Sequence, residues 1–175
     1  MIKALMLGAG KRPPQRALTA VNAKGVDEWV TLDIMSNANP DVLFDLTDLH
    51  AGGELPFEDG EFDEIHAYQV LEHVGRQGDW RGFFKEFKEY WRVLKPGGCM
   101  FISVPTLDTL WGSDVGHTRH IGPGTLGPLT KHFYERNEKT CATDYSGFVD
   151  PCWWSLQSIP GINDQQVFFV LRKDK

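Results

Sequence analysis

Cysteine and long apolar runs are both scarce in this chain of 175 residues. The three cysteines, Cys99, Cys141 and Cys152, are too few and too widely spaced for a disulfide framework or a cysteine-based zinc site. No apolar run approaches the roughly 20 residues that span a bilayer. The apolar stretch at 2–7 ends in glycines and lacks the cleavage pattern of a secretory signal. These absences predict a cytoplasmic protein without a membrane partner.

Positive charge is also in short supply. Lysine and arginine total 18 against 24 aspartates and glutamates, which gives a net charge of −6. A groove that binds nucleic acid without sequence preference needs a basic field, so the sequence predicts no nonspecific nucleic-acid binding. Aromatic residues make up 12% of the chain, and this share argues against a disordered protein. The length is typical of one domain with its own core.

Short apolar runs, punctuated by glycine, proline and acidic residues, predict the strands of a buried sheet. They cover residues 3–7, 29–32, 42–44, 62–70, 99–104 and 166–172. Near-continuous apolar strands are typical of a parallel sheet that is covered on both faces. Because strands, glycine turns and helical segments alternate, the sequence predicts a Rossmann-like, doubly wound α/β fold that ends in a hairpin.

One amphipathic helix follows Asp79, which is a suitable N-cap residue. Its apolar residues recur at spacings of three and four, so we expect them to form one stripe that packs on the sheet. They are Trp80, Phe83, Phe84, Phe87, Tyr90, Trp91 and Leu94. Charged residues, Glu86 and Arg92 among them, are expected on the opposite face.

Three further segments have weaker patterns. Pro13 and Pro14 are compatible with a first helical turn, so a short helix is predicted over 15–23. Residues 105–124 hold glycine, proline, threonine and histidine with little periodicity, and such a long irregular stretch is typical of a functional loop. Another short helix is predicted over 125–131.

A glycine turn, Gly8-Ala9-Gly10, follows the first predicted strand. Glycines at a strand end let the backbone approach a ligand and expose N–H groups. The third glycine of a dinucleotide-binding fingerprint is missing, because Pro13 stands there, and the Gly-Lys-Ser/Thr of a phosphate loop is absent. The turn is therefore unsuited to a pyrophosphate, which disfavours a nicotinamide oxidoreductase. An ordinary strand-to-helix connection is the alternative.

Aspartates end the next two predicted strands. Asp33 lies 23 residues after Gly10, near the spacing at which a carboxylate accepts hydrogen bonds from ribose hydroxyls. Asp45 would meet an adenine amino group. The carboxyl ends of parallel strands share one edge of a sheet, so these acids and the turn would form one pocket that suits a cationic, phosphate-free nucleoside. Taken singly, each aspartate is equally compatible with a helix N-cap.

A series of motifs follows in order along residues 3–105. They are Leu7–Gly10, Val30–Ile34, Asp41–Leu46, Leu55–Gly60, Phe62–Ile65, Val70–Val74 and Trp91–Gly98, with a weaker echo in His117–His120. This ordered set resembles the class I S-adenosylmethionine-dependent methyltransferase family, close to its small single-domain branch. The resemblance implies a mostly parallel, seven-stranded sheet with an antiparallel last strand. It also implies S-adenosylmethionine as methyl donor and S-adenosylhomocysteine as product.

The resemblance further implies a donor-binding role for residues matched by position. They are Leu7, Gly8, Ala9 and Gly10 for the methionine part, Asp33 and Ile34 for the ribose, Asp45 and Leu46 for the adenine, and Ala67 and Tyr68 for the sulfur and amino-acid part. The chain departs from the family where Arg12 replaces a third glycine. It also starts at the first strand, without the helix that covers the site in larger relatives. An open site follows, or one covered by a partner subunit or a second copy.

Histidines on the expected acceptor side are candidate general bases, because their pKa lies near neutrality. His73 follows the fourth predicted strand, and His117 and His120 lie in the irregular loop. We expect His73 and His117 to act as catalytic residues. The alternatives are a helix histidine bonded to backbone and solvated loop histidines. A metal is not expected, because no nearby cysteine completes a ligand set.

Aromatic and basic residues are further candidates. Trp111 and the pair Trp153-Trp154 would wall an apolar acceptor pocket, with core packing as the alternative. Lys11 and Arg12 would pair with the donor carboxylate or an anionic acceptor, unless they are simply solvated.

The sequence as a whole predicts methyl transfer from S-adenosylmethionine to a small-molecule acceptor. One domain would span residues 1–175, with a cofactor-binding half at 1–105 and an acceptor-side loop and terminal hairpin at 106–175. The alternative is a methyltransferase-like cofactor-binding or regulatory subunit without its own catalysis.

Overall fold

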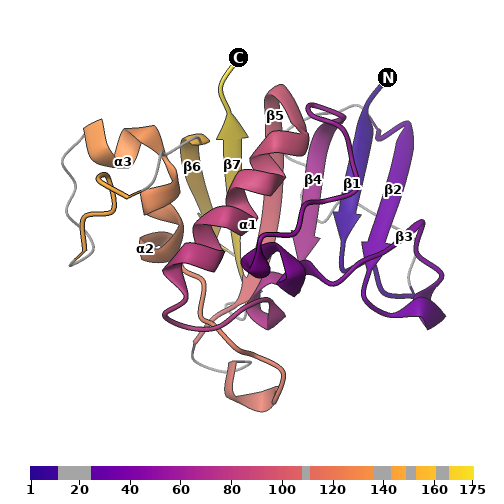
Figure 1. Cartoon of the computed structure of the whole chain (residues 1–175), viewed down its shortest axis with the longest axis horizontal. Coiled ribbons are helices and arrows are strands. Elements are labelled where there is room, and N and C mark those ends of the chain that lie inside the picture. Colours follow the sequence, from indigo (N-terminus) through magenta and orange to yellow (C-terminus); the bar gives the residue numbers. More distant parts are fainter. Residues whose placement is uncertain (12–24, 108–110, 136–142, 149–152, 161–165) are drawn as a thin grey trace.

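The described residues form one seven-stranded sheet flanked by helices (Figure 1). The computed structural model describes residues 1–11, 25–107, 111–135, 143–148, 153–160 and 166–175. Its strands are β1 (Lys3–Leu7), β2 (Glu28–Asp33), β3 (Val42–Leu43), β4 (Phe62–Tyr68), β5 (Leu94–Pro105), β6 (Trp153–Pro160) and β7 (Gln166–Lys173). Their order across the sheet is β3-β2-β1-β4-β5-β7-β6.

The direction of the strands confirms the predicted fold class. β1 to β5 run parallel, whereas β7 is antiparallel to both β5 and β6. In the centre of the sheet, Leu7 of β1 is level with Leu32 of β2 and with Ala67 of β4. The carboxyl ends of these three strands therefore meet at one edge of the sheet, the lower edge in Figure 1.

Helices cover the near face of the sheet in Figure 1. The α-helices are α1 (Trp80–Val93), α2 (Pro123–Leu126) and α3 (Lys131–Glu135), and the 3-10 helices are η1 (Ser36–Ala38), η2 (Leu46–Ala51), η3 (Leu71–His73), η4 (Trp111–Ser113) and η5 (Gly127–Leu129). Among the described residues, no helix combines the length and apolar character needed to cross a membrane. The helix predicted over 15–23 lies outside the described residues. The strand predicted before it, over 3–7, is present as β1.

Two predicted boundaries differ from the structure because of glycine and proline. β5 begins at Leu94 rather than at 99, directly after α1, and its pairing with β4 shifts register between Phe62 and Glu64. Gly97 has a φ of 79°, which lets the chain bulge there without breaking the strand. The single helix predicted over 125–131 is three short ones, since Pro128 has no N–H to donate within a helix.

α1 packs on the sheet through the stripe that the spacing predicts. Phe87, Tyr90 and Val93 are completely buried. The Asp79 carboxylate accepts a hydrogen bond from the Gly82 N–H at 3.0 Å, which confirms it as the N-cap. The expectation of an exposed charged face is wrong for one residue: Glu86 is completely buried.

Glu86 is buried because Arg119 pairs with it inside the core. Both guanidinium amino groups of Arg119 donate to the Glu86 carboxylate, at 2.7 and 2.8 Å, and its Nε donates to the Leu71 carbonyl at 2.9 Å. Tyr90 also donates to Glu86, at 2.8 Å. Burial raises the pKa of Glu86, but the charges and hydrogen bonds of Arg119 and His50 together outweigh it, so the pKa is lowered. This ion pair joins α1, η3 and the segment around Arg119.

Replacing Arg119 by methionine should lower the free energy of unfolding by about 3–5 kcal/mol, because Glu86 would stay buried without the guanidinium that pairs with both of its oxygens. Urea unfolding followed by circular dichroism measures the change. Arg76, an exposed arginine on the loop before α1, is the matched control. Arg76→Met should change stability by no more than about 0.5 kcal/mol. Similar stabilities for the two variants would contradict the assigned role of the pair.

His50 of η2 extends this network to a second carboxylate. Its Nε2 lies 2.9 Å from Glu86 Oε2, and its Nδ1 lies 2.9 Å from Asp79 Oδ2. The hydrogen bond with Glu86, aided by that with Asp79, raises the pKa of His50 above its ordinary 6.5 against the opposing effect of burial. Protonated His50 therefore stabilises the folded state.

Stability should fall as the pH rises through the raised pKa of His50. Below about 6.5 the imidazole is protonated in the folded and the unfolded chain, so its contribution is fully present, and it is lost as the folded form deprotonates. We expect the free energy of unfolding to decrease between pH 6 and pH 8 by a margin that His50→Gln removes. Urea titrations at several pH values test this. An identical pH dependence in the variant would rule out His50 as its source.

Candidate functional site

The glycine turn at the end of β1 adopts a conformation that favours glycine. Gly8 and Gly10 both have a φ of 60°, and the Gly8 N–H donates to the Leu32 carbonyl at 2.9 Å. A Cβ on Gly8 would lie 2.5 Å from Val70 Cγ2, whereas a Cβ on Gly10 would meet nothing within 4 Å. Gly8 therefore permits a close contact between the ends of β1 and β4, and Gly10 borders open space.

Asp33 ties this turn to the end of β2. Its Oδ2 accepts from the Gly10 N–H at 2.8 Å and its Oδ1 from the Met35 N–H at 2.8 Å. The residue is only 5% exposed. A carboxylate offers about four lone-pair sites, so these two bonds leave capacity for a ligand hydroxyl. The next residue, Ile34, is 61% exposed at the same edge.

Asp45 and Leu46 follow β3, but their side chains already have structural roles. Asp45 is the N-cap of η2, where its Oδ1 accepts from the Thr47 N–H at 2.8 Å. Leu46 is buried in the hydrophobic core. The N-cap role that the sequence left open for Asp45 is thus present.

Ala67 and Tyr68 end β4 at the same edge. Ala67 is completely buried between β1 and β5. The Tyr68 hydroxyl lies 2.6 Å from His66 Nδ1, so this side chain lies along the strand rather than beyond its end. Gln69, with a φ of 55°, then turns the chain away, which explains why β4 ends before the predicted residue 70.

His73 and His117 come together beside Glu72 just past the end of β4. The two imidazole centroids are 4.8 Å apart, and His117 Nδ1 lies 2.9 Å from the Trp111 carbonyl oxygen. Glu72 is 1% exposed, and neither of its carboxylate oxygens has a hydrogen-bond partner. Burial raises the pKa of Glu72. The structure thus places both candidate catalytic histidines in one cluster.

Backbone hydrogen bonds hold this cluster in place. The Glu72 carbonyl accepts from the Thr118 N–H at 2.8 Å and from the Arg119 N–H at 3.3 Å. These bonds clamp the loop that carries His117 onto η3, which carries His73. The ring of His120 lies against Trp111, which also contacts His117, and burial lowers the pKa of His120.

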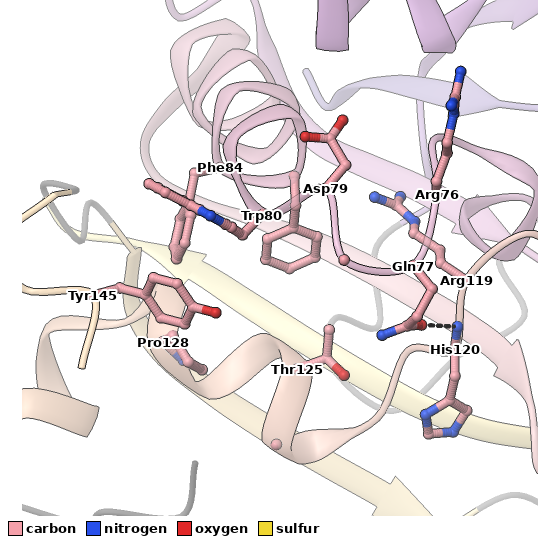
Figure 2. Close-up of a pocket in the computed structure, with 13 residues that line it drawn as sticks. Arg76, Gln77, Asp79, Trp80, Phe84, Arg119, His120, Thr125, Pro128 and Tyr145 are labelled. Atoms are coloured by element: carbon pink, nitrogen blue, oxygen red, sulfur yellow. Dashed lines mark hydrogen bonds between the residues drawn. The ribbon is translucent and has the colours of Figure 1, made fainter. Parts of the chain in front are cut away.

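A pocket of about 260 Å³ lies between the start of α1, α2 and Tyr145, and Arg119 and His120 also line it (Figure 2). The rings of Trp80, Phe84 and Tyr145 gather on one side of it, with the Trp80 and Tyr145 centroids 5.5 Å apart. On the other side, the Gln77 amide oxygen accepts from the His120 N–H at 2.9 Å. An aromatic wall with a polar rim is typical of small-molecule sites.

Three further candidates from the sequence are Trp153, Lys11 and Arg12. Trp153 is completely buried in the core and pairs with Lys173, at the opposite edge of the sheet from the carboxyl ends of the parallel strands. The proposed acceptor wall is therefore wrong for Trp153, and core packing is its role. Lys11 is exposed beside the turn. Arg12 lies outside the described residues.

Comparison with known protein families shows the family to which this chain belongs. Residues 5–102 match the family model described as a methyltransferase domain. The chain belongs to the methyltransferase-domain family. The match covers more than half of the chain and includes the glycine turn, the end of β2, the end of β4, Glu72 and His73, whereas His117 lies beyond it.

A curated relative extends the family assignment. The chain is 26% identical over 123 residues to a 27-O-demethylrifamycin SV methyltransferase from Amycolatopsis mediterranei (strain S699). This match covers 64% of the chain but 43% of the relative, so the chain aligns with less than half of that longer protein.

Solved structures confirm the methyltransferase fold. An S-adenosylmethionine-dependent methyltransferase from Archaeoglobus fulgidus has a TM-score of 0.60 at 14% identity, over 98% of this chain and 86% of its own. The N-methyltransferase NodS from Bradyrhizobium japonicum WM9, in complex with S-adenosylhomocysteine, has a TM-score of 0.52 at 13% identity, over 99% and 79%. At such low identities, these similarities concern the fold alone.

Sequence reasoning missed Glu72, which the structure adds to the two histidines. The sequence signal for Glu72 is weak, because the family resemblance assigns no role to this residue of the motif Val70–Val74. Only its burial and its two unpartnered oxygens, which depend on tertiary packing, distinguish it from an exposed glutamate.

Gly8→Ala should destabilise this methyltransferase domain more than Gly10→Ala. Both variants place a side chain at a φ of 60°, a strain of about 1–2 kcal/mol, but only the Gly8 variant drives its Cβ into Val70. Thermal unfolding of both proteins measures the difference. Adding Val70→Ala to Gly8→Ala should recover part of the loss. Equal stabilities of the two single variants would contradict the close contact.

Proposed function

We propose that this chain is an S-adenosylmethionine-dependent methyltransferase that acts on a small molecule. The observation that carries the proposal is the restrained glycine turn: Gly10 borders open space, and Asp33 fixes its N–H from the end of the neighbouring strand. Glycine at this strand end gives a ligand close access to the backbone. The family match supports the activity, and the S-adenosylhomocysteine complex of NodS supports the donor.

The proposed donor site follows the edge of the sheet from β4 to β3. The methionine part would lie along Leu7–Gly10, and the backbone of Ala67 and Tyr68 would border the sulfur. Asp33 would accept hydrogen bonds from the ribose hydroxyls, next to the exposed side chain of Ile34. The Asp45 carboxylate, of which Oδ1 caps η2, and the backbone of Leu46 would border the adenine, since the Leu46 side chain is buried in the core.

Methyl transfer from a sulfonium is an in-line displacement. The bond from the acceptor to the methyl carbon forms as the carbon–sulfur bond breaks, and the electron pair of that bond stays on sulfur. The leaving group is already activated, so positioning of the two reactants supplies most of the acceleration. His73 is the proposed general base for an acceptor that must lose a proton, because it is exposed just past β4. His117 would orient it.

The aromatic pocket beside α1 is the proposed place for part of the acceptor. The loop that follows His73 and the residues that follow His117 supply part of its lining, and α1 and Tyr145 supply the aromatic wall. Its ring-lined wall suits a planar or apolar molecule. A partner subunit or second copy that covers the open turn stays a prediction.

S-adenosylhomocysteine should stabilise the chain against heat, because a ligand that binds only the folded state raises its stability by about 2.7 kcal/mol at a hundredfold excess over Kd. Asp33→Ala should weaken this binding at least tenfold in calorimetric titration. Asp41→Ala is the matched control, because it removes another carboxylate, which accepts hydrogen bonds from Thr31 of β2. Unchanged affinity in folded Asp33→Ala would refute the ribose assignment.

Catalysis is tested separately with labelled donor and mixed small-molecule extracts. Labelled product that depends on the protein would support the methyltransferase. Donor binding without product in any extract would favour the alternative, a cofactor-binding or regulatory subunit. Binding of NADH in preference to S-adenosylhomocysteine would overturn the proposal as a whole.

A further inference from the structure

The cluster past the end of β4 has the composition of a metal site. Glu72, His73 and His117 each offer a ligand atom, and these atoms all lie within 4.8 Å of one another. One carboxylate and two imidazoles form a ligand set that holds zinc and related divalent metals at sites with an open coordination position. We propose that Glu72, His73 and His117 bind one divalent transition-metal ion.

The unpartnered carboxylate of Glu72 is the independent observation behind this inference. A buried carboxylate without hydrogen bonds or a counterion is costly, and nearly all buried polar atoms in proteins are paired. Arg119 is a candidate counterion from a surrounding element, but its guanidinium donates to Glu86 and Leu71. A bound cation would supply the partner that both oxygens of Glu72 lack.

His117 is already oriented as a ligand. Its Nδ1 lies 2.9 Å from the Trp111 carbonyl oxygen, so the tautomer with a proton on Nδ1 donates there and leaves the Nε2 lone pair available. A backbone carbonyl that holds the second imidazole nitrogen is a common feature of metal-binding histidines. His73 is exposed, which gives an ion a path into the cluster.

Little movement is needed to close this ligand set. Ligand atoms about 2.0–2.2 Å from a zinc ion lie roughly 3–4 Å from each other. In this structure the ligand atoms of Glu72, His73 and His117 lie up to 4.8 Å from one another, which exceeds this range by about one ångström. Rotation of the side chains can close this difference. The backbone needs no change, because the bonds from Thr118 and Arg119 to the Glu72 carbonyl already hold the two segments together.

The metal site also restricts the class of methyl acceptor, an inference that rests on the proposed function. Three protein ligands leave a position for an oxygen of the acceptor, and a hydroxyl bound to a divalent metal loses its proton more easily. An alcohol or phenol would then release its proton to water, its oxygen would bond to the methyl carbon, and the electron pair of the broken bond would stay on sulfur. His73 would be a ligand rather than a free base.

Metal binding is tested on the full chain after removal of any purification tag. Equilibrium dialysis against ZnCl2, with metal content measured by mass spectrometry, should give one zinc per chain. Glu72→Gln and His73→Ala should each weaken zinc binding at least tenfold. His73 is exposed, so its replacement leaves the fold intact even if Glu72→Gln does not. CoCl2 should give visible absorption bands that both variants lose.

His132→Ala is the matched control, because this surface histidine also has a glutamate beside it, with His132 Nδ1 3.2 Å from Glu135 Oε2. Its zinc binding should equal that of the unchanged protein. Absence of stoichiometric zinc, or equal uptake by His73→Ala and His132→Ala, would overturn the proposal.

S-adenosylhomocysteine titrations on the same preparations separate the two proposals. Loss of zinc binding with retained nucleoside binding would remove the metal site and leave the proposed function standing. Zinc binding without nucleoside binding would support the metal site and remove the proposed function together with the acceptor class.

Discussion

Arg119 lies where α1, η3 and the loop after β5 meet, and its guanidinium pairs with Glu86 inside the core. Two opposite charges that are buried together are stable only when they pair with each other. Movement of either residue would leave its partner as an unpaired charge in the apolar interior. His50 and Tyr90 occupy further positions around the same carboxylate. The histidine-bearing loop is therefore attached to the core by an ion pair, although its own sequence has little regular structure.

The strand ends illustrate what local sequence can predict. Gly8, Gly10 and Asp33 follow short apolar runs, and the topology of a parallel sheet brings such ends together without any knowledge of side-chain packing. The structure places them within hydrogen-bonding distance, with the Asp33 carboxylate on the Gly10 N–H. The fold class and the α1 stripe were predictable for the same reason, since both depend on periodicity along one segment.

Pairings between distant segments were not predictable in this way. Helical periodicity assigned Glu86 to a charged surface, because the arginine that neutralises it stands in another motif 33 residues away. Glu72 was missed for a related reason: its burial arises from the loop that folds over η3. Trp153 shows the converse, since an aromatic side chain that suits a pocket equally suits a core, and only the sheet register placed it at the far edge.

The close contact of Gly8 with Val70 couples the glycine turn to the segment that carries Glu72 and His73. Val70 directly precedes η3, and the His73 N–H donates to its carbonyl at 3.0 Å. A shift of the turn toward β4 would press on Val70, because Gly8 has no side chain that could rotate aside. Any molecule that displaces the turn thus also moves Val70, the first residue of the segment that carries Glu72 and His73. Binding at the glycine turn would therefore change the positions of these two side chains.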